Sequence, residues 1–207
     1  MFNDFLAARG IAKPYTDADY FAYVDGKPRY EGVASFLASR GIELPVGRAS
    51  DIPETDSVCG LGNRKNEYFN HVLARDGIAP YPGSLRLLDH LAAIELPMAV
   101  VSSSRNAEAV LDAAGLVDYF AVVMDGNLGH RLGLPGKPAP DVFVRAAQLL
   151  DVPVPDSVVL EDALSGVAAG AAGGFGLVVG IDRGAGVDAL EAAGADLVVA
   201  DCEELLP

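Results

Sequence analysis

The sequence of 207 residues contains few basic side chains for its length. Fifteen Lys and Arg residues stand against 29 Asp and Glu residues, which gives a formal net charge of −14. Surfaces that bind nucleic acids or anionic membranes need clustered cations to displace counterions, so neither partner is expected. A small anionic ligand, bound by a few local cations, is compatible with this balance.

Cysteine is also scarce. Cys59 and Cys202 are far apart and belong to no CxxC pattern or Cys/His cluster, which excludes a disulfide framework and a zinc site. The segment Met1–Gly10 carries Asp4 and Arg9 and lacks a basic start followed by an apolar stretch, so no signal peptide is expected. We therefore expect a cytoplasmic protein. The sequence leaves the oligomeric state open, with a monomer favoured.

Long uncharged runs are absent except for Ala163–Ile181, which has 19 residues and raises the question of a membrane span. The run is rich in glycine and alanine, and its bulky residues gather in Phe175–Ile181. We interpret it as a small-residue helix, a glycine turn and a buried strand.

The hydrophobic content of 51% excludes a disordered acidic chain, and the length suits one large domain or one domain with a smaller unit. From about Leu85, short β-branched runs alternate with helical stretches. The expected strands are Met98–Val101, Ala121–Met124, Val158–Leu160, Leu177–Ile181 and Leu197–Ala200. The expected helices are Arg105–Ala114, Pro140–Leu150, Ser165–Ala172 and Val187–Ala193, with Gly115, Gly173 and Gly194 as left-handed closing residues of three of them. Apolar strands that alternate with helices predict an α/β fold with a doubly wound, Rossmann-like parallel sheet covered on both faces.

The first 80 residues show helical spacing of apolar residues and no strand pattern. The expected helices are Phe5–Arg9, Asp17–Tyr23, Tyr30–Arg40 and Thr55–Arg75. We therefore predict a helical unit at about residues 1–80 and an α/β unit at about residues 81–207, with a hinge near Pro82.

Polar residues that follow apolar strands are the first candidates for a site, because ligands bind at the carboxyl ends of strands in open parallel sheets. Ser102 to Asn106 follow the first predicted strand. Hydroxyl and backbone N–H groups at a strand-to-helix turn favour a phosphate. Taken alone, a plain helix N-cap explains this segment at least as well.

A second candidate is Lys137, which lies between Gly136 and Pro138. The flanking prolines restrict the backbone and would direct the lysine inward. The surrounding sequence is not a P-loop, and a lone loop lysine is usually solvated.

The third candidate is the adjacent pair Glu161 and Asp162, which ends the strand Val158–Leu160. Mg²⁺ prefers carboxylate oxygens and retains water or phosphate oxygens as its other ligands. In isolation, helix capping by Asp162 is the simpler interpretation.

The order of these motifs is far more specific than any one of them. Val100–Asn106, Gly136–Phe143 and Val158–Val167 resemble the second, third and fourth motifs of the haloacid dehalogenase-like phosphohydrolases. Within that family the sequence is similar to the β-phosphoglucomutase-like branch with an all-helical cap. Asp25–Arg29 resembles its substrate-specificity loop, and Asn63–Asn66 resembles a cap helix that faces the substrate. The likeness covers essentially the whole chain.

The resemblance implies a role for each matching residue. Ser102 and Lys137 would be catalytic, the first donating a hydrogen bond to the phosphoryl group and the second neutralising its charge. Glu161 and Asp162 would bind Mg²⁺. The implied substrate-binding residues are Gly26, Arg29, Lys65, Asn66, Ser104, Arg105 and Asn106, although Arg29 and Lys65 are also compatible with solvated helix-surface charges.

The family's first motif, an apolar strand ending in Asp-x-Asp-Gly, has no counterpart in the sequence. In the family its first Asp is the nucleophile and a metal ligand, and its second is the general acid/base. The pairs Asp25-Gly26, Asp76-Gly77 and Asp125-Gly126 each lack an Asp two positions upstream. We expect either a natural protein that starts roughly 20–30 residues earlier, which we favour because the other motifs are complete, or a degenerate fragment.

The absent strand would be central in the family's fold, between the strands ending at Val101 and Leu160. We therefore expect these two strands not to pair with each other and to have unpaired edges. The implied function is Mg²⁺-dependent phosphoryl transfer on a small sugar phosphate, as phosphatase or mutase. The alternatives are a catalytically inactive module that binds a phosphorylated metabolite or a partner, and a nucleotide- or flavin-binding protein, which the lack of a G-x-G-x-x-G turn disfavours.

Overall fold

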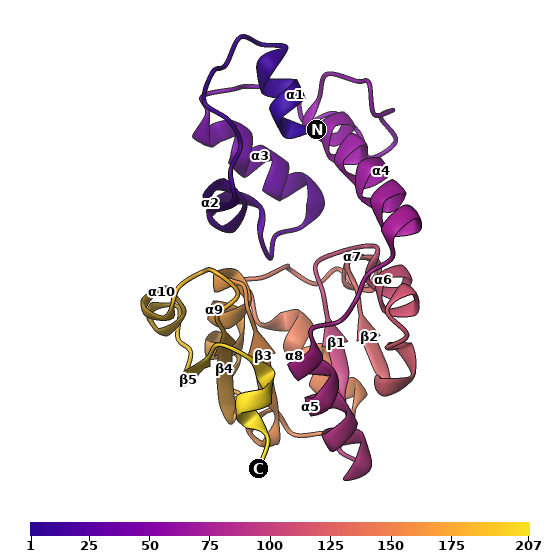
Figure 1. Ribbon diagram of the computed structural model, residues 1–207, viewed down its shortest axis with the longest axis vertical. Helices are drawn as coiled ribbons and strands as arrows, with labels where there is room; N and C mark the ends of the chain where they lie inside the picture. The colour runs from indigo at the N-terminus through magenta and orange to yellow at the C-terminus, as the bar shows by residue number, and fades with distance from the viewer. The chain divides into compact units, whose positions relative to one another are not determined.

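The computed structural model describes residues 1–207, which form two compact units, Met1–Gly77 and Ile78–Pro207 (Figure 1). We call them the cap unit and the core unit. The break lies a few residues before the expected position. Pro82 is the first residue of helix α5 (Pro82–Ala93), because its fixed φ and missing N–H suit a helix start.

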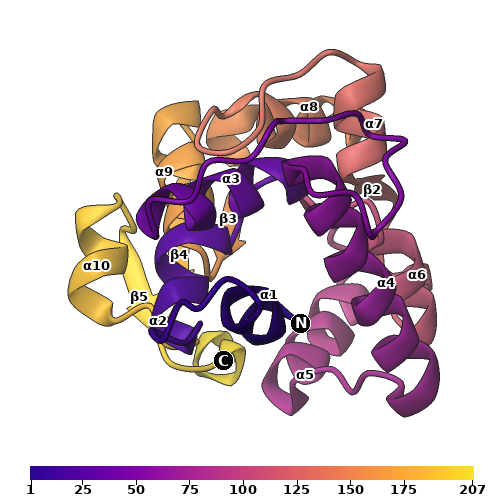
Figure 2. The ribbon, with the colours of Figure 1, turned by 90° about the horizontal axis from the view of Figure 1, so that it is seen from above.

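The cap unit is entirely helical. Its elements are α1 (Phe2–Ala7), α2 (Asp17–Asp19), a π-helical turn (Tyr20–Val24), α3 (Arg29–Ser39) and α4 (Val58–Asp76). All four expected helices are present, although the second changes to π-helix after Asp19. Buried apolar side chains from α1, α3 and α4 form one core, and α1 lies close to α3 in both views (Figures 1 and 2).

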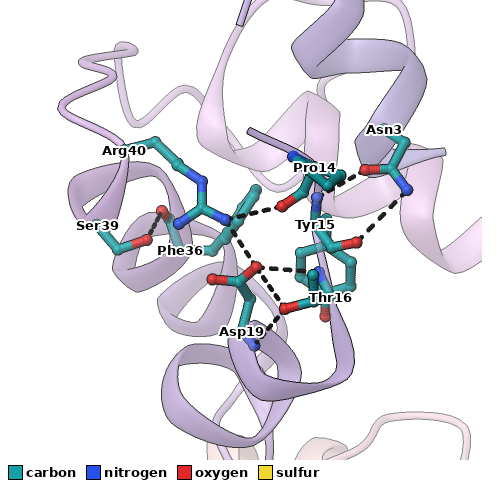
Figure 3. Close-up of polar contacts among 8 residues, drawn as sticks. All are labelled: Asn3, Pro14, Tyr15, Thr16, Asp19, Phe36, Ser39 and Arg40. Carbon is teal, nitrogen blue, oxygen red and sulfur yellow. Dashed lines mark hydrogen bonds and ion pairs between the residues drawn. The ribbon is translucent and has the colours of Figure 1, made fainter. Parts of the chain in front are cut away.

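A buried ion pair connects two parts of the cap unit. Arg40 Nη2 lies 2.7 Å from Asp19 Oδ2 (Figure 3). Both side chains are almost fully buried. The same Arg40 nitrogen donates to the Pro14 carbonyl, while Asp19 accepts bonds from the N–H and hydroxyl of Thr16. Thr16 in turn accepts from the Asp19 N–H, which completes a capping box at the start of α2.

The core unit alternates helices and short strands. Its elements are α5 (Pro82–Ala93), β1 (Ala99–Val101), α6 (Ala107–Ala113), a 3₁₀ turn (Val117–Tyr119), β2 (Val122–Met124), α7 (Gly126–Arg131), α8 (Asp141–Leu149), a 3₁₀ turn (Val154–Asp156), β3 (Val158–Glu161), α9 (Leu164–Gly173), β4 (Leu177–Ile181), α10 (Val187–Ala192), β5 (Leu197–Val199) and a 3₁₀ turn (Cys202–Leu205). All five expected strands and four expected helices are present. The expected helices did not include α5 or α7.

The strands form two separate parallel sheets, β1-β2 and β3-β4-β5 (Figure 1). β1 pairs only with β2. β3 pairs only with β4, in a register that begins with Val158 opposite Leu177. The expectation that the strands at Val101 and Leu160 do not pair is confirmed. Each of β1 and β3 consequently has one edge that pairs with no strand.

Helices cover both faces of the larger sheet, as predicted for a doubly wound fold. Val159 and Val178 pack with α8, α9 and α10 on one face. Val179 and Ile181 pack with Leu87 of α5 on the other face. β3 is not fully buried, because Val158 and Leu160 remain 53% and 39% exposed.

Two glycines close helices in the left-handed region as expected, Gly115 at φ 68° and Gly194 at φ 107°. At the end of α9 the left-handed residue is Gly174 and not Gly173, which remains helical. The run Ala163–Ile181 forms α9, a turn and β4, as we interpreted it. No helix in residues 1–207 combines the length and apolarity needed to cross a bilayer.

Candidate active site

The buried lysine of the core unit connects the ends of two strands that belong to different sheets. Lys137 Nζ lies 2.7 Å from Glu161 Oε2 at the end of β3 and donates to the Val101 carbonyl, 3.2 Å away, at the end of β1. Only 6% of Lys137 is exposed, so the solvated-lysine interpretation is wrong. An ammonium group has three donors, and one of the three is directed to neither of these partners.

The Ser102–Asn106 turn begins directly after Val101. Ser102 Oγ accepts from the Ser104 N–H at 3.1 Å, and Ser104 Oγ accepts from the Asn106 N–H at 3.1 Å. The first bond uses a lone pair of Ser102 and leaves its hydroxyl proton for another acceptor. The N-cap of α6 is Asn106, without a side-chain capping bond, so neither serine is a plain N-cap.

The acidic pair at the end of β3 contains two different carboxylates. Glu161 is buried against Lys137, whereas Asp162 is exposed. Burial raises the pKa of Glu161, and the charge of Lys137 opposes that shift. The N-cap of α9 is Ala163, without a side-chain capping bond, so Asp162 does not cap the helix.

A cavity of about 210 Å³ opens beside these carboxylates in the core unit. Besides Glu161 and Asp162, it is lined by Tyr81, Ser84, Leu160, Ile181, Arg183 and Cys202. Arg183 stacks on the Tyr81 ring at 3.7 Å and lies 3.3 Å from Asp201 Oδ2. This guanidinium therefore contributes a cation to the wall, although its charge is paired with Asp201.

A second cluster of predicted residues lies in the cap unit. Arg29, the first residue of α3, donates to Asn66 Oδ1 at 2.7 Å and to Asn63 Oδ1 at 3.3 Å, both on α4. Tyr30 donates its hydroxyl to the same Asn63 oxygen at 3.0 Å. The two amides fix the plane of the guanidinium without neutralising its charge. Arg29 is thus an oriented cation and not a freely solvated one.

Lys65 brings a second positive charge to this cluster. Burial lowers its pKa, and the neighbouring Arg29 lowers it further, while Asp25 acts in the opposite direction. Two cations that repel each other form a favourable place for an anion. Gly26 adopts a left-handed conformation, φ 67°, in the turn before α3, where a side chain would be strained.

The predicted residues thus form two groups, one in each unit. Ser102, Ser104, Arg105, Asn106, Lys137, Glu161 and Asp162 belong to the core unit, and Gly26, Arg29, Lys65 and Asn66 belong to the cap unit. Within the core group Lys137 and Glu161 are in direct contact, and Lys137 contacts the residue before Ser102. The side chains of Ser104 and Arg105 are exposed.

The carboxylates available for Mg²⁺ are few. Residues 1–207 contain no cluster of three or more acidic, histidine or cysteine side chains suited to a metal ion. Mg²⁺ is nevertheless commonly bound by one or two carboxylates, with water and substrate phosphate as further ligands. The uncompensated Asp162, next to Glu161, fits that smaller set.

Two residues with a place in these clusters, Arg183 and Asn127, were missed, and Asn63 was predicted only as part of the substrate-facing stretch Asn63–Asn66. Asn63 orients Arg29, Arg183 lines the cavity, and Asn127 donates to the Arg105 carbonyl at 3.0 Å. Arg183 comes two residues after the strand Leu177–Ile181, so the strand-end rule would have found it. Asn127 acts through a contact distant in sequence and gave no comparable signal, and the contact of Asn63 with Arg29 was not predicted for the same reason.

The model of the family "haloacid dehalogenase-like hydrolase" matches residues 4–174. The chain belongs to this hydrolase family, which is a family of enzymes. It is similar to a β-phosphoglucomutase from Mycobacterium tuberculosis (strain CDC 1551 / Oshkosh), with 46% identity over 215 residues, covering 100% of this chain and 82% of that protein. It is also similar to the β-phosphoglucomutase of Bacillus subtilis (strain 168), with 31% identity over 208 residues, covering 97% of this chain and 83% of the relative.

A solved structure gives the same result for the fold. CbbY from Rhodobacter sphaeroides in complex with xylulose-(1,5)bisphosphate matches with a TM-score of 0.74 and 25% identity, over 99% of this chain and 86% of that one. The family member described here therefore belongs to the β-phosphoglucomutase-like branch, with a Rossmann-like core and a helical cap. The resemblance inferred from the motifs is confirmed.

Proposed function

We propose that this hydrolase-family chain binds the phosphoryl group of a small sugar phosphate and transfers it in a Mg²⁺-dependent reaction. The observation that carries the proposal is the position of Lys137, buried between the carboxyl ends of β1 and β3. Because Val101 precedes Ser102, one cation and one hydroxyl donor belong to the same strand end. A buried cation with one remaining donor is suited to a phosphate oxygen.

Each core residue then has a defined task. Lys137 neutralises charge on the phosphoryl oxygens, Ser102 donates its hydroxyl proton to one of them, and Glu161 holds the lysine in place. Phosphoryl transfer depends mainly on position and charge stabilisation, so these tasks match the needs of the reaction. Asp162, with Glu161, would hold Mg²⁺, which supplies further positive charge when bound.

The substrate class is suggested by the relatives. Two of them are β-phosphoglucomutases, and a third binds xylulose-(1,5)bisphosphate. Within the cap unit, the cations Arg29 and Lys65 supply a place suited to an anion or to sugar hydroxyls. We assign Gly26, Arg29, Lys65 and Asn66 to substrate binding, together with Ser104, Arg105 and Asn106 of the core unit.

A second candidate is a module that binds a phosphorylated metabolite without turnover. It is favoured by one observation: the carboxylate bound to Lys137 is Glu161, and residues 1–207 contain no Asp-x-Asp-Gly sequence to supply a nucleophile. Binding requires Ser102 and Lys137, whereas formation of an aspartyl-phosphate requires a further aspartate.

Phosphate release from a panel of aldose and ketose phosphates, with and without Mg²⁺, distinguishes the two. Transfer predicts Mg²⁺-dependent turnover that Lys137→Ala abolishes and the exposed control Lys13→Ala retains. Binding without turnover by the wild-type chain would instead establish the module. Analysis of the sugar product separates a phosphatase, in which water attacks, from a mutase, in which a second substrate hydroxyl attacks.

A further inference from the structure

The segment that follows β2 forms hydrogen bonds to the backbone of the Ser102–Asn106 turn. The Gly126 N–H donates to the Ser104 carbonyl at 3.0 Å, and the Asn127 amide donates to the Arg105 carbonyl at 3.0 Å. The Ser102 N–H donates to the Met124 carbonyl at 2.9 Å, which extends the β1-β2 pairing into the turn. Three backbone groups of the turn are therefore bound by Met124, Gly126 and Asn127, the residues on either side of Asp125.

Asp125 organises this segment. Only 7% of the residue is exposed, and its Oδ1 accepts from the Leu128 N–H at 2.7 Å at the start of α7. Its Oδ2 accepts from the Asn127 amide at 2.7 Å. Because the Asp125 carboxylate can only accept, it fixes the orientation of the Asn127 side-chain amide. The amide nitrogen, and not its oxygen, therefore faces both Asp125 and the Arg105 carbonyl.

Gly126 has a separate steric role. A Cβ at this position would lie 2.5 Å from the Ser103 carbonyl oxygen and 3.2 Å from the Ser103 and Ser104 carbonyl carbons. All three atoms belong to the backbone of the turn, so a side chain at 126 would have to displace the turn itself. Gly129, in the same helix, differs: a Cβ there would meet only Val142 Cγ1, at 3.7 Å.

We propose that Asp125, Gly126 and Asn127 are positioning residues that hold the Ser102–Asn106 turn in its anion-binding shape. This inference rests on the proposed phosphate binding by that turn. Gly126 and Asn127 donate to backbone carbonyls of the turn, and neither bond involves the Ser102 hydroxyl. The segment therefore determines where the Ser102 hydroxyl lies and does not change its acidity or hydrogen bonding.

The test is a titration of the full chain with inorganic phosphate, followed by the amide NMR signals of Ser102, Ser104 and Asn106. Gly126→Ala is expected to weaken phosphate binding about tenfold, by analogy with the loss of affinity when residues that orient metal ligands are removed. Gly129→Ala makes the same chemical change in the same helix and is expected to bind as the wild type. The melting temperature of each variant is measured beside its affinity, because a purely structural role would change stability without changing the affinity of the folded protein.

Asn127→Asp is the second variant and decides the matter if Gly126→Ala does not fold. It is isosteric but places a carboxylate oxygen against Asp125 and the Arg105 carbonyl, so weaker phosphate binding is again expected. Asn70→Asp, on the exposed side of α4, controls for the added charge. Wild-type affinity in both Gly126→Ala and Asn127→Asp would overturn the positioning role but not the proposed phosphate binding. Absence of phosphate-induced shifts in the wild-type turn would overturn both this role and the proposed phosphate binding.

Discussion

Lys137 and Glu161 form a buried ion pair, with 2.7 Å between Nζ and Oε2 and side-chain exposures of 4% and 10%. Lys137 also donates to the Val101 carbonyl and lies 4.7 Å from the centre of the Phe143 ring. The pair lies at the ends of two strands that share no backbone hydrogen bond. One side chain thus stabilises the junction of the sheets and carries the charge that we assign to phosphate binding.

Removal of one partner is expected to be costly. Lys137→Met leaves the Glu161 carboxylate buried without its cation, and the free energy of unfolding should fall by about 3–5 kcal/mol. Replacement of both, Lys137→Met with Glu161→Gln, should recover part of this loss, because no uncompensated charge remains. Urea unfolding of the wild type, the single variants and the double variant measures the coupling. Additive losses would show that the two side chains do not interact.

The unpaired strand edges predict a pattern of hydrogen exchange. β4 pairs with strands on both sides and should be strongly protected. Alternate amides of β1 and β3 face an edge that pairs with no strand and should exchange much faster. Exchange measured residue by residue on the full chain checks this pattern. Uniform protection along β3 would mean that another strand pairs with it.

The cap unit should lose stability at acid pH through Asp19. Its pKa is lowered chiefly by the hydrogen bond from Arg40, with further bonds from Thr16. A carboxyl whose pKa is lowered on folding stabilises the fold above its ordinary pKa, near 4, and loses that contribution as the pH falls through the lowered value. Asp19→Asn should therefore cost about 3 kcal/mol at pH 7 and much less at pH 2.

Denaturant unfolding of Asp19→Asn and the wild type across this pH range provides the measurement. Asp56→Asn, which removes the more exposed partner of Arg9, is the control and should change stability by less than about 1 kcal/mol. A cost for Asp19→Asn that is the same at pH 2 and pH 7 would contradict the assigned role of the ionised carboxylate.

Arg29 should affect sugar-phosphate binding through its shape as well as its charge. Arg29→Lys retains the charge but loses the planar group that Asn63 and Asn66 orient. We expect affinity for a sugar phosphate to fall about tenfold, the equivalent of one charge-assisted hydrogen bond. Calorimetric titration measures this, with Arg75→Lys on the exposed end of α4 as control. Unchanged affinity would remove Arg29 from the binding site.

The sequence predicted the fold well where hydrophobic pattern dominates. The strand Leu177–Ile181 has the predicted bounds because its apolar run is long and buried on both sides. Helix α7 was missed because Gly126 and Gly129 weaken helix propensity, and its start depends on a cap by Asp125. Helix α5 was not among the expected helices because Pro82 was interpreted as part of a hinge region and not as a helix start.

The site was predicted in its residue types but not in its contacts. The motif order identified Lys137 and Glu161, yet their pairing depends on tertiary structure that brings together positions 24 residues apart. The simpler interpretations of Ser102, Lys137 and Asp162 failed for the same reason, since burial and capping are set by neighbours distant in sequence. The sequence predicts which groups carry the chemistry, and the fold determines which of them touch.

The central claim is that Ser102 and Lys137 together bind a phosphoryl group in the core unit. The most direct measurement is a crystal structure of the full chain soaked with tungstate, a heavy-atom analogue of phosphate that can be located by its anomalous signal. We predict an anomalous peak within hydrogen-bond distance of both Ser102 Oγ and Lys137 Nζ. A strong peak elsewhere, with none at these two atoms, would contradict the claim.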